Sequence, residues 1–224
     1  EGLPIYHEVF DGNAAETRTL LPTLTKVLSR FPSVQRMVLV ADRGLLSLDN
    51  LAALKAVRLA SGKPLEFIVA VPGRRYNEFI DLLEPFHAQQ CTAATQEVIS
   101  EHAWNDLRLV VAHDPVTAAT KTQQRNERID TLIHQAEQWT GKLTDSGAKA
   151  RFYRAVSEAH LSRILKVDLS EELFSYHIDE KARRLAQMMD GKLLLVTNAE
   201  GLPASNLLAR YKSLADIERG FKVL

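Results

Sequence analysis

The apolar and polar positions of the first third of the chain alternate between strand and helix patterns. Residues 3–10 alternate with a period of two and predict a strand, and residues 15–30 carry leucines at helical spacing and predict a helix. Residues 36–42 and 65–71 are nearly continuous apolar runs, which are typical of strands buried on both faces. With a second predicted helix over residues 47–60, the pattern indicates an α/β domain with a mostly parallel sheet.

The middle of the chain has a different pattern. We predict a short helix at 77–83 and strands at 95–101 and 107–113. Asp114 and Pro115 form a good helix start, because Asp caps the first turn and Pro has no N–H to lose there. The long polar helix that follows ends near Gly141. Residues 142–147 have the weakest pattern and are a candidate linker, before mixed helical, strand and helical segments that run to residue 189.

The end of the chain returns to the first pattern. Residues 192–197 predict a buried strand, and a helix follows from about residue 203. One face of this helix is apolar and aromatic. We therefore predict one α/β domain formed by residues 1–73 and 190–224. Residues 74–189 are interpreted as a long, mostly helical insertion domain.

Composition narrows the class of protein. The 224 residues are 46% hydrophobic and 25% charged with a formal net charge of zero, which is typical of an ordinary globular chain. No apolar run approaches the roughly 20 residues that a bilayer span needs, so no membrane partner is expected. The single cysteine, Cys91, has no partner for an internal disulfide, and this favours a cytosolic location. Because the chain opens without Met and stops within a predicted helix, we expect it to be a piece of a longer protein.

Asp42 is the first candidate for chemistry. It follows a predicted buried strand and precedes Arg43 and Gly44. Ligands of open α/β sheets bind beyond the carboxyl ends of strands, and a carboxylate there suits a hard cation. The alternative is a turn-forming aspartate, since Asp readily forms local hydrogen bonds before Gly.

Glu218 is the second candidate. It lies on the predicted final helix seven residues after Tyr211, so both lie on one side of that helix. An ordinary exposed glutamate is the alternative. Taken together, Asp42 and Glu218 are the residue types that phosphoryl transfer needs, because carboxylates from separate elements must converge on two divalent metals about 3.5–4 Å apart.

Two early stretches resemble the DDE transposases of bacterial insertion sequences. Residues 2–5 and 10–13 are similar to the family's Gly-Leu-Pro strand and its Gly-Asn turn. Residues 38–44, Val-Leu-Val-Ala-Asp-Arg-Gly, with Asn50 in the next predicted helix, resemble the strand that carries the family's second aspartate.

A third stretch completes the resemblance at the other end of the chain. Residues 190–192, Asp-Gly-Lys, with Thr197 and Asn198, resemble the family's Asp-Gly…Thr-Asn strand. Tyr211, Glu218 and Phe221 resemble its Tyr…Glu…Phe helix. Each motif is weak alone, but the three occur in the family's order, and the long insertion between them matches in position and length.

The resemblance implies a ribonuclease-H-like fold with a mixed sheet, lacking its first strands, and an insertion domain before the final strand and glutamate helix. It implies Mg²⁺ or Mn²⁺ as cofactor and metal-dependent cleavage and strand transfer of double-stranded DNA at transposon ends. Asp42 would be the second catalytic aspartate and Glu218 the glutamate, and both would bind metal. Tyr211 matches the family's signature tyrosine, which positions DNA or the glutamate. A homodimer in the active complex and a bacterial cytoplasmic, nucleoid-associated location are also implied.

The sequence departs from the family pattern at positions that bear on catalytic activity. The family's first aspartate lies upstream of the Gly-Leu-Pro segment and has no counterpart here, and Asp11 only occupies the acidic turn position. In the signature Tyr-x2-Arg-x3-Glu-x6-Lys the arginine position is Leu214, and the lysine position falls just after Leu224. We therefore expect this chain to be inactive alone, and its incomplete sheet to pair unusually or to dimerise.

Although the chain has no net charge, basic residues gather locally and are candidates for binding DNA. Residues 147–166 carry five basic side chains against one acidic side chain, interleaved with Phe152 and Tyr153. Basic residues with aromatics track phosphates and stack on bases, whereas the alternative is an ordinary solvated helix face. The candidates for DNA contact are Tyr211, Lys222, Arg43, Lys149, Arg151 and Arg154.

Other functions find less support in the sequence. The histidines form no His-x3-His pair, and no Gly-x-Ser-x-Gly, Walker or Gly-x-Gly-x-x-Gly motif occurs. Two alternatives stay open beside the transposase interpretation. One is a non-enzymatic, truncated remnant that binds DNA or oligomerises, and the other is an unrelated α/β enzyme in which Asp42 and Glu218 lie far apart.

Overall fold

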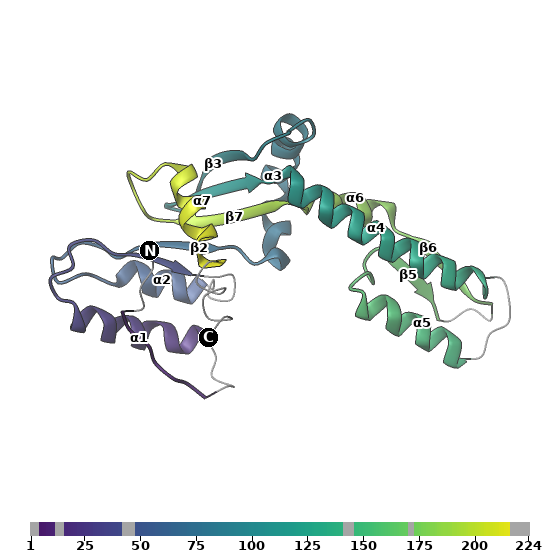
Figure 1. The fold of residues 1–224 in the computed structure, drawn as a ribbon, viewed down its shortest axis with the longest axis horizontal. Helices are drawn as coiled ribbons and strands as arrows, with labels where there is room; N and C mark the ends of the chain where they lie inside the picture. Colours follow the sequence, from purple (N-terminus) through teal and green to yellow (C-terminus); the bar gives the residue numbers. More distant parts are fainter. Residues whose placement is uncertain (1–4, 12–15, 42–47, 141–145, 170–172, 216–224) are drawn as a thin grey trace. The chain divides into compact units, whose positions relative to one another are not determined.

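The computed structural model describes residues 5–11, 16–41, 48–140, 146–169 and 173–215 (Figure 1). Within these residues the protein is mixed α/β, with seven α-helices, a mixed five-stranded sheet and a separate two-stranded sheet. The chain divides into two compact units. Unit 1 comprises residues 1–86, 98–112 and 193–224, and unit 2 comprises residues 87–97 and 113–192.

The five-stranded sheet has the order β1-β2-β7-β4-β3. Strand β1 (Val38–Ala41) runs parallel to β2 (Glu66–Ala70), with Val38 opposite Glu66 and Ala41 opposite Val69. Strand β7 (Lys192–Thr197) runs antiparallel to β2. The expected mostly parallel sheet is therefore a mixed one, because β7 enters beside β2 from the opposite direction.

Helices connect and cover the strands of unit 1. Helix α1 (Glu16–Arg30) precedes β1 and packs against α2 (Leu48–Ala56), which connects β1 to β2. After β2, a 3₁₀ helix η2 (Gly73–Phe79) leads directly into α3 (Ile80–Phe86). Helix α7 (Ala204–Lys212) packs against both outer strands, β1 and β3, and so crosses one face of the sheet (Figure 1).

The inner strands are buried on both faces, as their apolar runs predict. Phe67, Ile68 and Val69 are consecutive and each is at most 1% exposed. Because successive side chains of a strand point to opposite faces, burial of all three means that both faces of β2 are covered. The same expectation is wrong for β1, whose first three residues are only half-buried because it is the outermost strand of the sheet.

Two other predicted strands lie in this sheet. Strands β3 (Val98–Trp104) and β4 (Leu107–His113) are joined by the tight turn at Asn105 and Asp106, and β4 is the neighbour of β7. Asn105 adopts a left-handed φ of 47°, which suits a short hairpin turn. Residues 98–112 thus belong to the compact unit that also contains β1 and β2, although they fall inside the predicted insertion of residues 74–189.

Unit 2 contains the long helix α4 (Pro115–Glu137), together with α5 (Ser146–Glu158) and α6 (Glu180–Met189). Strands β5 (Leu165–Asp168) and β6 (Ser175–Ile178) form its antiparallel pair, and η3 (His87–Cys91) is a single π-helical turn. The predicted N-terminal cap of α4 is confirmed, since the side chain of Asp114 accepts a hydrogen bond from the N–H of Val116 at 3.0 Å.

An aromatic core stabilises unit 2. Phe152 and Phe174 are 2% and 1% exposed, and their ring centroids are 5.4 Å apart in an edge-to-face arrangement. Trp139 contacts both rings edge to face and is therefore part of this core. Edge-to-face pairs of this kind add about 0.5–1.5 kcal/mol each beyond their burial. Phe152 is consequently not available to stack on a base, and of the two aromatic residues that interleave with the basic ones only Tyr153 is exposed.

The strand predicted at residues 3–10 is not present among its described residues. Residues 5–11 lie in no helix or strand. Instead, the carboxylate of Glu8 accepts hydrogen bonds from Tyr6, from Thr23 and from Lys26, the last two on α1. A period-two pattern becomes a strand only where a neighbouring strand pairs with its backbone, and within the described residues this segment has side-chain contacts to α1 instead.

Candidate functional site

The carboxyl end of β1 is the position that the sequence assigns to metal chemistry. Asp42 and Arg43 themselves lie outside the described residues. The strand that precedes them, β1, lies within the described residues. Its last residue, Ala41, is 3% exposed and lies opposite Val69 of the parallel strand β2. Asp42 therefore directly follows the carboxyl end of a parallel pair of strands, the edge at which α/β sheets bind ligands.

Helix α7 brings Tyr211 to the same hydrophobic cluster as β1. Leu207 and Leu208 are 0% and 2% exposed and belong to a cluster with residues of β2, β4 and β7. Tyr211 and the β1 residues Val38 and Val40 pack around this cluster as partly buried neighbours. The structure thus brings together the helix of Tyr211 and the strand before Asp42. Glu218 and Lys222 lie outside the described residues.

Each residue of the Asp-Gly-Lys segment at the start of β7 has a structural role in unit 2. Asp190 accepts hydrogen bonds from Arg125 at 2.6 Å and from Thr122 at 2.7 Å, both on α4. Gly191 has a φ of +70°, and a Cβ built on it would lie 2.4 Å from the carbonyl oxygen of Asp114. Only glycine fits this close approach, because it has no Cβ and tolerates positive φ. The segment therefore fixes the start of β7 against α4.

Lys192, the third residue of this segment, is the centre of a buried polar cluster. Its Nζ lies 3.1 Å from Nδ1 of His87 and 3.0 Å from Nδ1 of His113, and it also interacts with Cys91. We call these four residues the Lys192 cluster. Lys192, His113 and Cys91 are each at most 4% exposed. No sequence motif joins these residues, although a polar side chain at the end of an otherwise apolar strand, as at His113 and Lys192, is a signal that marks two of them.

Burial changes the acid–base properties of the cluster. Desolvation lowers the pKa of Lys192, and the interactions with Cys91 and Asp190 oppose this. Burial and the nearby Lys192 charge lower the pKa of both His87 and His113. The pKa of the Cys91 thiol is raised, again mainly by burial. Every basic group of the cluster therefore favours its uncharged form more than it would in water.

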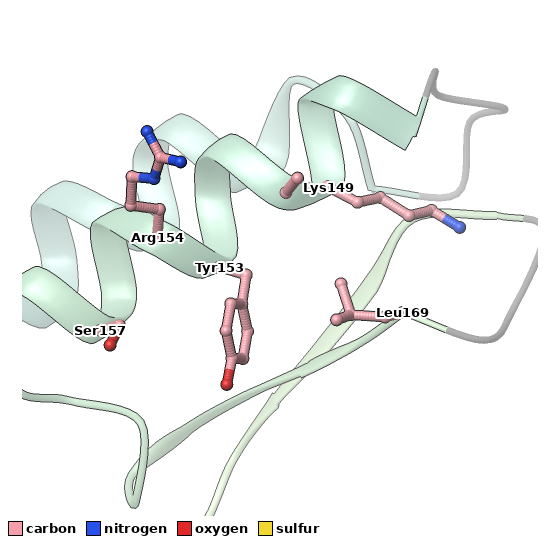
Figure 2. A pocket seen from close by; sticks show the side chains of 6 residues that line it. Lys149, Tyr153, Arg154, Ser157 and Leu169 are labelled. Atoms are coloured by element: carbon pink, nitrogen blue, oxygen red, sulfur yellow. The ribbon is translucent and has the colours of Figure 1, made fainter.

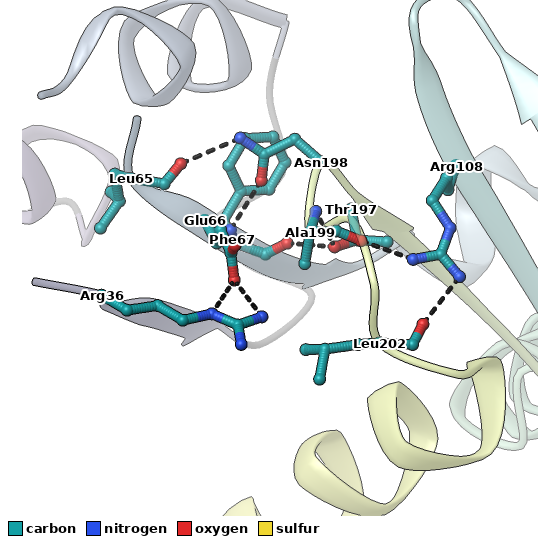
Figure 3. A network of polar contacts seen from close by, with 9 residues as sticks. All are labelled: Arg36, Leu65, Glu66, Phe67, Arg108, Thr197, Asn198, Ala199 and Leu202. Atoms are coloured by element: carbon teal, nitrogen blue, oxygen red, sulfur yellow. Dashed lines mark hydrogen bonds and ion pairs between the residues drawn. The ribbon is translucent and has the colours of Figure 1, made fainter. Parts of the chain in front are cut away.

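Thr197 and Asn198 fasten the other end of β7 to β2 (Figure 3). The Thr197 hydroxyl donates to the carbonyl of Phe67 at 2.6 Å. The amide of Asn198 donates to the carbonyl of Leu65 at 2.9 Å and accepts from the N–H of Phe67 at 2.8 Å. The Thr-Asn motif is thus a clamp between two strands, and its position at the start of β2 is the end opposite to the one that Asp42 follows.

Helix α5 holds the candidate basic surface of unit 2. A pocket of about 560 Å³ is lined by Lys149, Tyr153, Arg154, Ser157 and Leu169, with Ala150 (Figure 2). Figure 2 shows Tyr153 descending from α5 beside Leu169, with Arg154 on the opposite side of the helix. Tyr153 is 48% exposed and Leu169 is 53% exposed, whereas Lys149 is only 8% exposed. Arg151 is exposed on the same helix and does not line the pocket.

The described part of the chain shows neither a metal-binding cluster nor a membrane-spanning helix. There, no group of three or more His, Cys, Asp or Glu side chains has a geometry that holds a metal ion. None of the described helices is long and apolar enough to cross a membrane.

Comparison with known proteins adds no assignment. No protein-family model, no curated protein and no solved structure matches the chain. The interpretation of the site therefore depends on its residues and their geometry.

Proposed function

We propose that this chain is part of the catalytic core of a DDE transposase, in which Asp42 and Glu218 bind Mg²⁺ or Mn²⁺ for phosphoryl transfer on DNA. One observation carries the proposal. The strand that ends directly before Asp42 and the helix of Tyr211, which precedes Glu218 by seven residues, pack in one hydrophobic cluster. This is the arrangement that a shared metal site needs, because carboxylates from distant parts of the sequence must meet at one edge of the sheet.

The proposed fold is the ribonuclease-H-like one, and the topology of unit 1 supports it. A helix precedes β1, another connects β1 to its parallel neighbour β2, and α7 covers the sheet after β7. Strand β1, which ends directly before Asp42, and α7, which ends before Glu218 in the sequence, are thus the first and last regular elements of the described sheet unit after α1. Because the family's first aspartate has no counterpart in this chain, the proposed metal site is incomplete and the chain is inactive alone.

Double-stranded DNA is the proposed partner, and α5 supplies a surface for it. Arg151, Tyr153 and Arg154 are all exposed on this helix. Arginine side chains bind phosphates through charge, and an exposed aromatic ring adds contact with a sugar or base. Lys149 is largely buried, so on this surface the two exposed arginines are the main candidates for phosphate contact.

The test is DNA cleavage and joining by the longer protein that the proposal implies, in the presence of Mn²⁺ or Mg²⁺. Asp42→Ala and Glu218→Gln should each abolish both reactions. The matched controls are Asp81→Ala and Glu84→Gln, which change exposed acidic residues of α3 and should leave activity intact. Full activity of an Asp42→Ala, Glu218→Gln double variant would contradict the proposal, as would strand transfer by the 224-residue chain itself.

A further inference from the structure

The Lys192 cluster has no part in the proposed DNA chemistry, yet three of its four titratable side chains are buried in unit 2. It joins three segments that are distant in the sequence. His87 and Cys91 are the two ends of η3, His113 ends β4, and Lys192 begins β7. The rings of His87 and His113 also contact each other edge to face, with centroids 5.9 Å apart. These contacts hold η3 against the ends of two strands.

Hydrogen-bond chemistry limits the number of protons that this cluster accepts. A charged lysine has three donors and no acceptor, and a neutral imidazole accepts at one nitrogen and donates at the other. Lys192 therefore donates to Nδ1 of both rings when both are neutral, which leaves the proton of each ring on Nε2. If either ring is protonated as well, its Nδ1 becomes a donor and faces a donor. The contact between Nζ and that Nδ1 is then repulsive in both charge and hydrogen bonding.

Nearby acidic groups offset this repulsion only in part. The carboxylate of Asp190 is directed to Arg125 and Thr122, and that of Asp114 caps α4 through Val116 and Thr117. Both favour positive charge in the cluster, Asp190 at Lys192 and Asp114 at His113. Their effect is smaller than that of burial, which is the largest influence on Lys192 and on both histidines.

The cluster borders open space on one side. A pocket of about 620 Å³ is lined by His87, Cys91 and His113 together with residues of α4, including Glu127 and Asp130. Three residues of η3, at positions 88–90, are exposed. A single π-helical turn has few internal hydrogen bonds, so its attachment depends on the contacts at its two ends. An imidazole that leaves Lys192 therefore has open space beside it, in a pocket whose lining includes carboxylates.

We propose that the Lys192 cluster is an acid-operated latch: protonation of His87 or His113 separates that ring from Lys192, releases η3 from the ends of β4 and β7, and exposes Cys91. The latch stands independently of the transposase proposal.

The direction of the pH dependence follows from the histidines. Their pKa values lie below the ordinary 6.5 in the closed state, so the open state binds the proton more tightly. The stability that the two neutral histidines give the closed state is fully present above pH 6.5, and it is lost as the pH falls below 6.5 towards the lowered values. Uptake of one proton shifts the balance towards the open state by at most about tenfold for each pH unit in that window.

Cys91 is the only cysteine of the chain and reports directly on opening. The experiment measures its labelling by 4,4′-dithiodipyridine, a disulfide that reacts with thiols in acid as well as at neutral pH. Each rate is divided by the rate for the denatured chain at the same pH. Between about pH 8 and about pH 5 the ratio for the native protein should rise several-fold, with the rise beginning near the ordinary histidine pKa of about 6.5. A ratio that stays constant over this range would overturn the proposal.

Three variants separate the latch from general acid unfolding. In the double variant His87→Asn, His113→Asn, the amide oxygen still accepts from Lys192 but does not titrate, so the rise should disappear. Lys192→Met should weaken the rise, because a single protonated ring no longer meets a second positive charge. His134→Asn changes a histidine on α4 whose side chain is 83% exposed, and it should behave as the native protein does. An unchanged rise in the double variant would overturn the proposal.

Hydrogen exchange measured on the native protein tests the proposal even if the double variant does not fold. After correction for intrinsic rates, amides of residues 87–92 should lose protection in acid while those of α5 keep it. Equal loss in both segments would mean that unit 2 unfolds as a whole, and the latch would be excluded.

Discussion

Asp190 and Arg125 form an ion pair at 2.6 Å in which both side chains are mostly buried, with exposures of 11% and 13%. The pair connects the residue just before Gly191 to the middle of α4, and Thr122 donates a further hydrogen bond to the same carboxylate oxygen. It therefore anchors the start of β7 within unit 2. The Asp-Gly-Lys motif, which the sequence associates with a catalytic family, has a demonstrable structural role here.

Replacing Asp190 by alanine should destabilise unit 2 strongly. The loss leaves the Arg125 charge buried without its partner, and breaking a buried pair in this way typically costs about 3–5 kcal/mol. The measurement is urea unfolding followed by Trp139 fluorescence in a Trp104→Phe background. The comparison is Asp106→Ala, which removes an exposed partner of Lys55 and should cost about 0–1 kcal/mol. Equal losses in the two variants would contradict the anchoring role.

Gly191→Ala should be far more damaging than Gly201→Ala. Both glycines have positive φ, 70° and 75°, so both substitutions incur the conformational cost of about 1–2 kcal/mol. At Gly191 the new Cβ would also lie 2.4 Å from a backbone oxygen, whereas at Gly201 nothing lies within 4 Å. The difference in unfolding free energy between the two variants isolates the steric clash. A difference near zero would mean that α4 shifts away from the strand without cost.

Asn198→Ala should weaken the attachment of β7 to the start of β2. Its amide makes two hydrogen bonds to the β2 backbone, and leaving such groups unsatisfied costs about 1–3 kcal/mol. Thermal unfolding of the variant is the measurement, with Asn206→Ala on the exposed side of α7 as its control. If both variants melt together with the native protein, water replaces the clamp and the motif has another purpose.

The strands of unit 1 show what local pattern predicts and where it fails. The runs that became β2 and β7 are continuously apolar, and both strands lie inside the sheet, where such runs are stable. The run before Asp42 is just as apolar, but its strand is the outermost one, and a position at the edge depends on the order of all five strands. Residues 5–11 fail for the same reason, since their pattern contains no information about which strand, if any, would pair with them.

The candidate sites also divide into local interactions, which the sequence predicts, and contacts between distant residues, which it does not. The cap of α4 by Asp114 is a local interaction, and the sequence predicts it correctly. The Lys192 cluster joins His87 to Lys192 across 105 positions of the sequence, and no spacing rule detects such a contact. Phe152 and Tyr153 both alternate with basic residues in the sequence, but on α5 Phe152 packs in the aromatic core while Tyr153 is exposed.

DNA affinity should depend on the exposed residues of α5. Arg154→Ala should weaken binding of duplex DNA and reduce the slope of log affinity against log salt by roughly 0.9, the value for one phosphate contact. Tyr153→Ala should weaken binding with little change in that slope, because a ring contact releases no counterion. Fluorescence anisotropy over a range of salt concentrations measures both quantities. Arg30→Ala, at the exposed end of α1, is the control, and an equal loss in that variant would assign the binding to general charge.

The most direct measurement of the central claim is metal-directed cleavage of the polypeptide by Fe²⁺, which substitutes for Mg²⁺ at oxygen-rich sites and cuts the backbone nearby when ascorbate and peroxide are added. If Asp42 and Glu218 share a divalent metal, the longer protein that the proposal implies is cut near both residues, excess Mg²⁺ suppresses both cuts, and Asp42→Ala or Glu218→Gln removes them together. The control Glu84→Gln leaves the cuts unchanged. Cuts that are absent from these two positions, or that persist in the variants, would contradict the account.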